Sequence, residues 1–417
     1  MARKNLGNFD GMLHSGLGSH FRAGGSGYSS TTYDPLNAFL PGHMARWISH
    51  VARFWFHKKC AFRDWTAPGK GTGVFPIADR ATFSLVGDWG TGTDEAQKVA
   101  ERVADSAPDY TIHLGDVYFV GDETEIRENF LGERTSPYEP VKWPMGRIGS
   151  FALSGNHENY ARGFGYFESI LPKMGLRQSG AYWGSGQWAS FFCLENKFWR
   201  IIGLDTGYNS IGFDWGRMPV LGKSKWLRKS VHLKPICNLP KPVMSWLEQV
   251  VKPNADKRGL ILITHHGCSS AFGEWYQIPA VQLAPLIHRR VIWFWGHEHK
   301  LAIYDCYRVR NGIEAHGRCI GHGGMPVERG KMPDLDAPWL AWDNRRYVND
   351  EKIDVGFNGH ANLSFDGPTM RVEYRDLNGA LLFTEDWRVD LSSGELHGPH
   401  LTKVLDDASL HFRSKAT

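Results

Sequence analysis

Short apolar runs that each end at a glycine or a polar cluster recur from about residue 80 to residue 300. Between the first two runs, DEAQKVAERVADSAPDY places Ala96, Val99 and Val103 on one stripe at helical spacing and begins with acidic residues, which suit a helix N-terminus. Strands that alternate with helices are typical of an α/β fold, so this stretch is predicted to be a crossover helix between two parallel strands. The runs lie in FSLVGDWG, YTIHLGDVY, FALSGNHEN, RIIGLDTGY, LILITHHG and VIWFWGHEHK.

The residues before this region divide into two parts, which together form a predicted N-terminal unit over residues 1–78. Residues 1 to about 40 are rich in Gly, Ser, Asn and His without periodicity, which predicts a loosely ordered arm. Residues 43–60 carry an aromatic stripe at helical spacing with basic residues on the other faces, which predicts an amphipathic helix. The stripe would either dock on the body of the same chain or contact a membrane surface or a partner.

The main domain is predicted to cover residues 79–390. Within it, residues 208–243 hold several Gly, Pro and Lys residues and no clean period, so we interpret them as an insertion. Residues 362–387 are typical of three strands, with an Asn-Gly turn between two of them, and this meander would close a second sheet. Residues 391–417 are polar and are predicted to form a tail.

Composition and charge are those of an ordinary soluble protein. Hydrophobic residues make up 42% of the chain and charged residues 22%, which excludes the disordered and fibrous classes. The net charge of +4 is spread along the chain, so it does not by itself indicate nucleic acid. No stretch reaches the roughly 20 apolar residues of a transmembrane helix, and the start lacks the apolar core of a signal peptide. Six cysteines without metal-finger or disulfide spacing complete the expectation of a soluble, cytoplasmic protein with reduced thiols.

Polar residues of metal-binding type follow five of the apolar runs. In an open α/β sheet, residues just past the carboxyl ends of parallel strands converge on one crevice, and a preceding glycine permits the tight turn needed there. Carboxylates, an amide oxygen and imidazoles suit Mn, Fe, Zn, Co or Ni, and no thiolate is among them. Two such ions about 3.5–4 Å apart can share a hydroxide and clamp both oxygens of a displacement at phosphorus. The residues are Asp88, Asp116, Asn156, His157, His265, His266, His297 and His299.

The ordered series GDWG, GDVY, GNHE, THH and GHEH, within residues 84–299, resembles the five motifs of the calcineurin-like metallophosphoesterases. That family includes the purple acid phosphatases and many phosphodiesterases. Any one motif is unspecific, but GNHE and GHEH in order behind two aspartates are a specific combination. The resemblance implies a four-layer α/β-β/α sandwich of two mixed sheets flanked by helices. It also implies hydrolysis of phosphate monoesters or diesters by a hydroxide that two divalent or trivalent metal ions activate.

The same resemblance implies a role for each residue. Asp88 and His299 would bind one metal ion, and Asp116 would bridge the two. The second ion would be held by Asn156, His265 and His297. His157 would be an outer-sphere acid, close enough to protonate a leaving alkoxide. The preference for His265 over His266 rests on the family pattern, in which the first histidine of such a pair is the ligand.

Two positions depart from the family pattern. Gly90 stands where many members have a histidine. The purple acid phosphatases lack that histidine too, but they supply a tyrosine three residues after the second aspartate, where this chain has Phe119. Tyr118 lies one place earlier and, on a strand, would point to the opposite side, an argument that is weaker if the residue lies in a loop. The first metal would then have three protein ligands, weaker occupancy and no purple iron-tyrosinate colour.

Two other functions remain open at this point. The sandwich could be a non-catalytic scaffold or binding protein, which the missing fourth ligand favours. A nuclease would need a basic groove, for which the scattered Lys and Arg residues give slight support. Among residues outside the set, we interpret Asp205 as structural and His113 as a core histidine, and we regard His322 and Arg162 as candidates to touch a phosphate.

Overall fold

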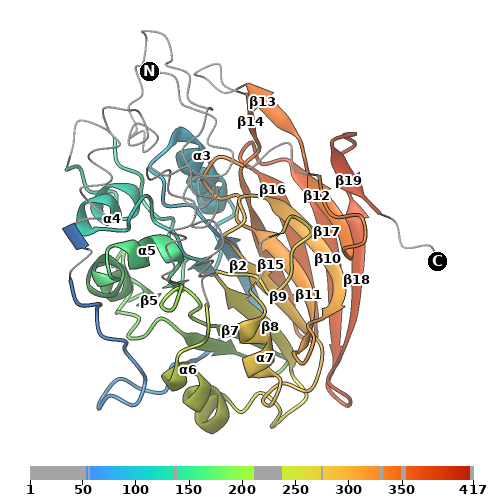
Figure 1. Ribbon diagram of the computed structural model, residues 1–417, viewed down its shortest axis with the longest axis horizontal. Helices are drawn as coiled ribbons and strands as arrows, with labels where there is room; N and C mark the ends of the chain where they lie inside the picture. Colours follow the sequence, from blue (N-terminus) through green and yellow to red (C-terminus); the bar gives the residue numbers. More distant parts are fainter. Residues whose placement is uncertain are drawn as a thin grey trace, which may run out of the picture.

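Two large β-sheets lie face to face in the protein, and helices cover their outer faces (Figure 1). The structure is a computed structural model, and it describes residues 53–54, 57–135, 139–210, 237–273, 276–327, 332–348 and 354–413. Within these residues no helix is long and apolar enough to cross a membrane.

The eight-stranded sheet has the strand order β18-β17-β16-β15-β2-β3-β4-β5. Its β2, β3 and β4 are parallel, and β15 to β18 extend it as an antiparallel meander beside β2. The strands are β2 (Arg80–Val86), β3 (Tyr110–His113), β4 (Gly149–Ala152), β5 (Gly175–Leu176), β15 (Gly359–Asp366), β16 (Thr369–Asp376), β17 (Leu381–Asp390) and β18 (Glu395–Lys403).

The nine-stranded sheet has the order β1-β6-β7-β8-β9-β11-β10-β12-β19, in which β7, β8 and β9 are parallel neighbours. A separate two-stranded ribbon pairs β13 (Arg346–Val348) with β14 (Asp354–Gly356). The strands of the large sheet are β1 (Val74–Pro76), β6 (Phe192–Glu195), β7 (Trp199–Gly203), β8 (Gly259–Thr264), β9 (Val291–Trp295), β10 (Leu301–Arg308), β11 (Glu314–Ile320), β12 (Trp339–Asp343) and β19 (Leu410–Phe412).

Three buried hydrophobic clusters divide the molecule into four layers. The central cluster fills the space between the sheets, where strand residues such as Leu85 and Ile263 are fully buried. A second cluster packs one set of helices on the eight-stranded sheet, and a third packs the other set on the nine-stranded sheet. The first set is α3 (Asp94–Asp105), α4 (Glu123–Asn129), α5 (Asn156–Tyr160) and the turns Tyr166–Ile170 and Leu171–Lys173; the second is α6 (Lys241–Trp246), its continuation Leu247–Val251, and α7 (Ile278–Leu283). The predicted α/β-β/α sandwich is therefore confirmed.

The predicted crossover helix is α3, which joins the parallel strands β2 and β3. Its N-cap is Thr93, whose hydroxyl accepts a hydrogen bond from the backbone of Ala96. The predicted stripe, including Val99 and Val103, is buried. The carboxyl end of β2 is thereby brought next to that of β3, which places the two loops that follow these strands side by side.

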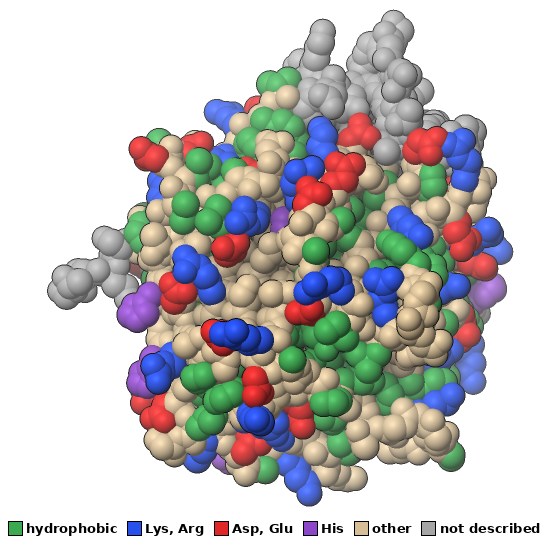
Figure 2. Space-filling model, turned by 180° about the vertical axis from the view of Figure 1, so that it is seen from behind, with side chains coloured by type: hydrophobic (Ala, Val, Ile, Leu, Met, Phe, Trp, Pro, Cys, Tyr) green, Lys and Arg blue, Asp and Glu red, His purple; other side chains and the backbone are tan. Residues whose placement is uncertain are grey.

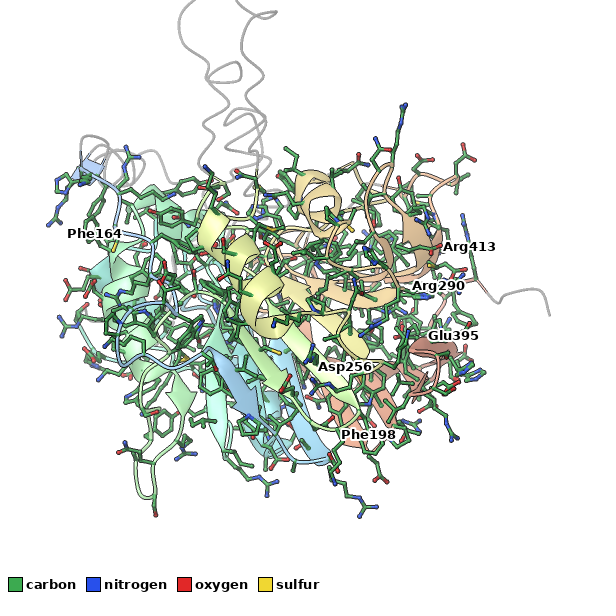
Figure 3. All side chains as sticks on the ribbon, turned by 90° about the horizontal axis from the view of Figure 1, so that it is seen from below. Phe164, Phe198, Asp256, Arg290, Glu395 and Arg413 are labelled. Atoms are coloured by element: carbon green, nitrogen blue, oxygen red, sulfur yellow. The ribbon has the colours of Figure 1, made fainter. Side chains whose placement is uncertain are left out.

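The polar tail predicted from residue 391 is wrong for most of its length. Residues 395–403 form β18 on β17, and residues 410–412 form β19 on β12, where Arg413 donates to the carbonyl of Leu340. Glu395 and Arg413 both lie at the periphery of the sheets (Figure 3). One face of β18 is solvated, and Leu396 is the only buried residue of the strand. The strand therefore has too few apolar residues to show the alternation of hydrophobic and polar positions that predicts a half-buried strand.

Other predicted boundaries shift by a few residues. Strand β1 lies inside the predicted N-terminal unit, yet it pairs with β6 of the nine-stranded sheet. Helix α6 begins at Lys241, within the predicted insertion, and residues 211–236 of that insertion lie outside the described residues. The arm and most of the amphipathic helix predicted over 43–60 also lie outside them. The meander over 362–387 forms three strands as predicted, but it extends the sheet that contains β2.

Candidate metal centre

The six predicted ligand residues come together between the carboxyl ends of the two sheets. Asp88, Asp116 and Asn156 follow β2, β3 and β4 of one sheet, and the histidines follow β8 and β9 of the other. All six are nearly or fully buried, with exposed fractions between 0 and 5%. The centre is thus assembled from both sheets of the sandwich, whereas the convergence predicted from the apolar runs was that of strand ends in one open sheet.

One group of side-chain atoms surrounds the amide oxygen of Asn156. The Oδ1 atom of Asn156 lies 3.0 Å from Nε2 of His265 and 3.0 Å from Nδ1 of His297. Nε2 of His265 also lies 3.2 Å from Oδ2 of Asp116. Ligand atoms held about 2.0–2.2 Å from one metal ion lie roughly 3 Å from one another, so these separations fit a single ion.

A second group forms around the hydroxyl of Tyr118. This hydroxyl lies 2.9 Å from Oδ1 of Asp88, 3.2 Å from Oδ2 of Asp116 and 3.0 Å from Nε2 of His299. Oδ2 of Asp116 therefore belongs to both groups. The prediction that Tyr118 points away from the centre is wrong, because β3 ends at His113 and the tyrosine lies in the loop beyond it, where strand alternation no longer applies.

The hydrogen bonds of His265 show which of its atoms faces the centre. Its Nδ1 lies 2.9 Å from the carbonyl oxygen of Leu114 and must donate to it, since a carbonyl only accepts. The lone pair of a neutral His265 is then on Nε2, directed at the oxygens of Asn156 and Asp116. Three acceptors that face one another need a cation or a proton between them. Burial lowers the pKa of His265, but Asp116 and Asp88 outweigh it and raise that pKa.

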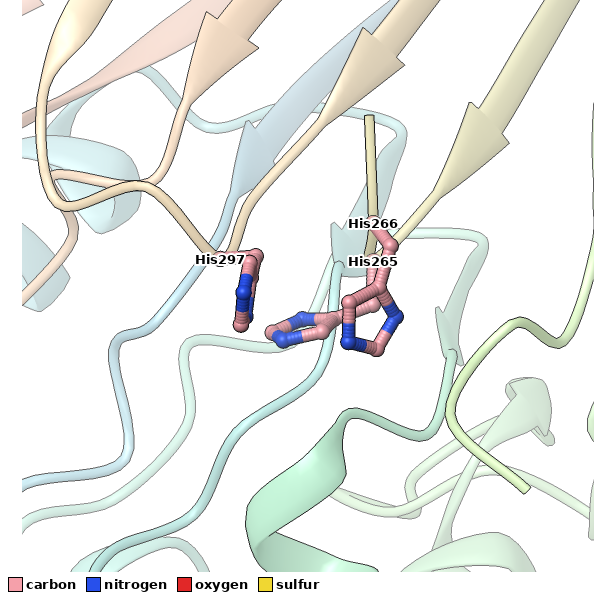
Figure 4. A group of neighbouring side chains, drawn as sticks. All are labelled: His265, His266 and His297. Atoms are coloured by element: carbon pink, nitrogen blue, oxygen red, sulfur yellow. The ribbon is translucent and has the colours of Figure 1, made fainter. Parts of the chain in front are cut away.

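His266 belongs to a cluster of three imidazoles with His265 and His297 (Figure 4). Its Nδ1 and its backbone amide both lie against the hydroxyl of Thr206, at 3.1 and 3.0 Å. The contacts with Asn156 and Asp116 are made by His265 instead. This geometry favours His265 as the ligand, and the choice stays a prediction.

The backbone at three of the six positions adopts left-handed values of φ, which are 58° at Asp88, 72° at Asp116 and 66° at His297. Such values cost a residue other than glycine about 1 kcal/mol or more. Around them the loops approach closely. A Cβ atom at Gly155 would lie 2.0 Å from Oδ1 of Asp116, so only glycine fits at that position.

A model of the calcineurin-like phosphoesterase family matches residues 81–301, just over half of the chain, and this stretch contains every residue of the centre. The chain belongs to the calcineurin-like phosphoesterase family. The resemblance drawn from the five motifs is thereby confirmed. No curated protein sequence matches the chain.

Solved structures similar to this family member share little sequence with it. GAP50, the anchor in the inner membrane complex of Plasmodium, has a TM-score of 0.44 at 12% identity, over 75% of this chain and 89% of its own. The purple acid phosphatase PPD1 from yellow lupin seeds scores 0.43 at 13% identity, over 76% of this chain and 55% of its own. PhoD scores 0.45 at 12% identity, over 79% and 72%.

Glu158, which is not among the predicted site residues, holds the loops of the candidate centre together. Its carboxylate accepts hydrogen bonds from the backbone amides of Gly155, Asp116 and Val117, at 2.8, 3.2 and 2.9 Å. Burial and the nearby Asp116 raise the pKa of Glu158 to about 8. Glu158 follows His157 directly in GNHE, and this position in the motif was the available signal in the sequence. The residue is fully buried, and a buried carboxylate needs several hydrogen-bond donors.

The predicted acid, His157, is fully buried next to the shared carboxylate. Its Nδ1 lies 2.6 Å from the carbonyl oxygen of Phe119 and donates to it. Its Nε2 lies 3.8 Å from Oδ2 of Asp116, and its ring packs 4.3 Å from that of Tyr118. The histidine therefore presents Nε2 to the candidate centre.

The residues considered outside the set take other positions in the described structure. Oδ1 of Asp205 accepts a hydrogen bond from the amide of Tyr208 at 2.7 Å, as expected for a structural residue. His113 packs on Trp143 in the core, and burial lowers its pKa to about 3. His322 is buried too, and burial lowers its pKa to about 4. Arg162 donates through Nε to the carbonyl of Phe54, so nothing in these contacts places it against a phosphate.

Proposed function

We propose that the protein hydrolyses phosphate esters with two metal ions held by Asp88, Asp116, Asn156, His265, His297 and His299. The observation that carries the proposal is the convergence of buried acceptor atoms, above all Nε2 of His265 between the oxygens of Asn156 and Asp116. A cation between these atoms would explain why three buried acceptors face one another, and a scaffold offers no such explanation.

Tyr118 would be a fourth ligand of the first metal site. Its hydroxyl touches Asp88, Asp116 and His299, the three residues assigned to that ion. Membership of the family and the mixture of oxygen and nitrogen donors favour Mn, Fe, Zn, Co or Ni. Two such ions would make a water molecule nucleophilic near neutral pH and would neutralise charge on the phosphoryl oxygens.

The protein residues beyond the ligands would handle the proton. With Nδ1 donating to the carbonyl of Phe119, His157 exchanges protons only through Nε2, which faces the shared carboxylate of Asp116. In its protonated form it can donate to the oxygen that leaves with the alcohol. We therefore propose His157 as the general acid.

We favour a small phosphate ester over a nucleic acid as the substrate. On the face shown in Figure 2, Lys and Arg side chains are interspersed with Asp and Glu rather than gathered in one stripe. Binding to a nucleic acid backbone requires a continuous basic surface. A nuclease activity is consequently a less favoured outcome of the experiment below.

The test uses full-length protein stripped with a chelator and reloaded separately with Mn, Zn, Co or Fe. It is assayed with p-nitrophenyl phosphate, with its bis ester and with single-stranded DNA. We expect metal-dependent turnover of an aryl ester, a drop in kcat of about 10²–10⁴-fold in His157→Ala, and loss of bound metal in Asn156→Ala.

The matched control is Asp205→Asn, which changes another buried aspartate at a strand end that touches none of the candidate ligands in the described structure. It should keep the activity of the wild type. Equal inactivity of wild type, Asn156→Ala and His157→Ala with every metal would contradict the proposal and support a scaffold.

A further inference from the structure

Two half-buried tyrosines contact the residues proposed to hold the second metal ion. The hydroxyl of Tyr160 accepts a hydrogen bond of 3.1 Å from Nδ2 of Asn156. The hydroxyl of Tyr276 lies 2.9 Å from Nε2 of His297. Each hydroxyl therefore faces the side of a ligand residue that is turned away from the cluster of acceptor atoms.

An asparagine ligand requires a fixed orientation of its amide. The side chain carries one oxygen that can bind a metal ion and one NH₂ group that cannot, and a half-turn exchanges them. In this structure Oδ1 of Asn156 points at His265 and His297, while Nδ2 donates to Tyr160. Tyr160 stands four residues after Asn156 in α5, so both side chains lie on one face of that helix.

A histidine ligand requires a fixed tautomer in the same way. Nδ1 of His297 faces Oδ1 of Asn156, so if both atoms bind one metal ion, this nitrogen must carry the lone pair and Nε2 must carry the proton. The hydroxyl oxygen of Tyr276 lies where it can accept that proton in a hydrogen bond.

Tyr276 is itself anchored to the loop that follows β8. Its amide donates to the carbonyl of Gly267 at 2.9 Å, and its ring packs edge-on against His266 at 4.8 Å. These two contacts fix the backbone and the ring of Tyr276. They therefore also fix its hydroxyl, as is required of a group that orients another side chain.

We propose that Tyr160 and Tyr276 are positioning residues for the second metal ion, the first by orienting the amide of Asn156 and the second by fixing the tautomer and ring direction of His297. This inference rests on the proposed function, because it presupposes metal binding at these ligands. Loss of a hydrogen bond that orients a metal ligand typically weakens metal binding about 10–100-fold.

The test measures metal affinity rather than activity. Full-length, metal-free wild type, Tyr160→Phe and Tyr276→Phe are titrated with Mn²⁺ and with Zn²⁺ in a calorimeter. We expect two binding steps in the wild type, and one of them weakened about 10–100-fold in each variant. The control is Tyr208→Phe, which removes a hydroxyl that donates to the carbonyl of Cys60 and touches no candidate ligand in the described structure.

A second variant separates orientation from general damage to the fold. In Asn156→Asp either carboxylate oxygen can face the ion, so the amide no longer needs to be oriented. Tyr160→Phe should then weaken metal binding in the wild type but have no effect in the Asn156→Asp background, and a merely structural tyrosine would not show this coupling.

The outcomes separate the two proposals. Metal affinities in Tyr160→Phe and Tyr276→Phe within twofold of the wild type, or equal effects of Tyr160→Phe in both backgrounds, would overturn the inference and leave the proposed function standing. A wild type that binds neither metal would overturn both. If Tyr276→Phe does not fold, as judged by thermal melting without metal, the Tyr160 pair decides.

Discussion

At the scale of single residues, the direction of the Tyr118 side chain could not be predicted from strand alternation. The sequence places a tyrosine two residues after Asp116, and alternation along a strand turns it away from the centre. The chain leaves the strand at His113, five residues earlier, and the loop turns the hydroxyl toward Asp88 and His299. The direction of a side chain in a loop depends on backbone angles that no periodicity records.

This placement reverses the expected colour of an iron-loaded sample. If Tyr118 binds the first metal, protein reloaded with Fe³⁺ should show a visible charge-transfer band from phenolate to iron, and Tyr118→Phe should lack it. Absorption spectra of both proteins at equal iron content provide the measurement. A band of equal intensity in the variant would exclude Tyr118 as the source.

Glu158 makes a separate prediction about stability. In Glu158→Gln one carboxylate oxygen becomes an NH₂ group, so one of the backbone amides of Gly155, Asp116 and Val117 would face a donor. At pH 9, above the raised pKa of Glu158, we expect the free energy of unfolding of the metal-free protein to fall by about 1–3 kcal/mol, measured by urea denaturation. The exposed Glu395→Gln should change it by less than about 0.5 kcal/mol, and equal effects of the two substitutions would refute the role of Glu158.

At the scale of elements, a buried ion pair joins the two sheets across the core. Arg318 on β11 of one sheet contacts Glu385 on β17 of the other at 2.8 Å, and both are fully buried. Arg345 beyond β12 similarly reaches Asp376 on β16 at 3.0 Å. Because the candidate centre takes ligands from both sheets, contacts that fix one sheet against the other also fix the distances within the centre.

Removal of one partner should therefore be costly. Arg318→Met leaves the carboxylate of Glu385 buried without its cation, and we expect a loss of about 3–5 kcal/mol in the free energy of unfolding. Its natural control is Arg80→Met, which breaks the exposed pair Arg80–Asp366 between β2 and β15 and should change little. Chemical denaturation of both variants provides the measurement. Similar midpoints would show that the buried pair contributes no more to stability than the exposed pair.

The same scale explains how much of the fold could be predicted from sequence. Strands that are buried on both faces, such as β8 and β9, are continuous apolar runs in the sequence. The ends of β2, β3 and β4 locate Asp88, Asp116 and Asn156, and those of β8 and β9 locate the histidines. Strand β18 is polar because one of its faces is solvated, so it was taken for a tail. The contribution of both sheets to the centre also depends on packing between distant elements, which a local pattern does not contain.

At the scale of the whole molecule, buried histidines make stability depend on pH. Burial is the main cause that lowers the pKa of His360 to about 3 and that of His322 to about 4. In the unfolded chain both would titrate near about 6.5. Below that pH the unfolded state binds more protons than the folded state, so stability falls as the pH falls, by about 1.4 kcal/mol per pH unit for each histidine until its folded pKa is reached.

Urea denaturation of the metal-free protein between pH 7.5 and 4.5 tests this dependence. The wild type should lose stability throughout the acidic part of the range, and His360→Leu should lose it less steeply. The same slope in both proteins would show that His360 is not a source of the acid sensitivity.

The left-handed backbone at Asp88, Asp116 and His297 has one more consequence. Glycine would relax each of these positions, so a chain under pressure only to fold would gain by giving up two carboxylates and an imidazole. In this chain the three strained positions instead carry those side chains, within one small volume. Strain concentrated in this way is typical of binding and catalytic sites, where the surrounding contacts hold the backbone in place.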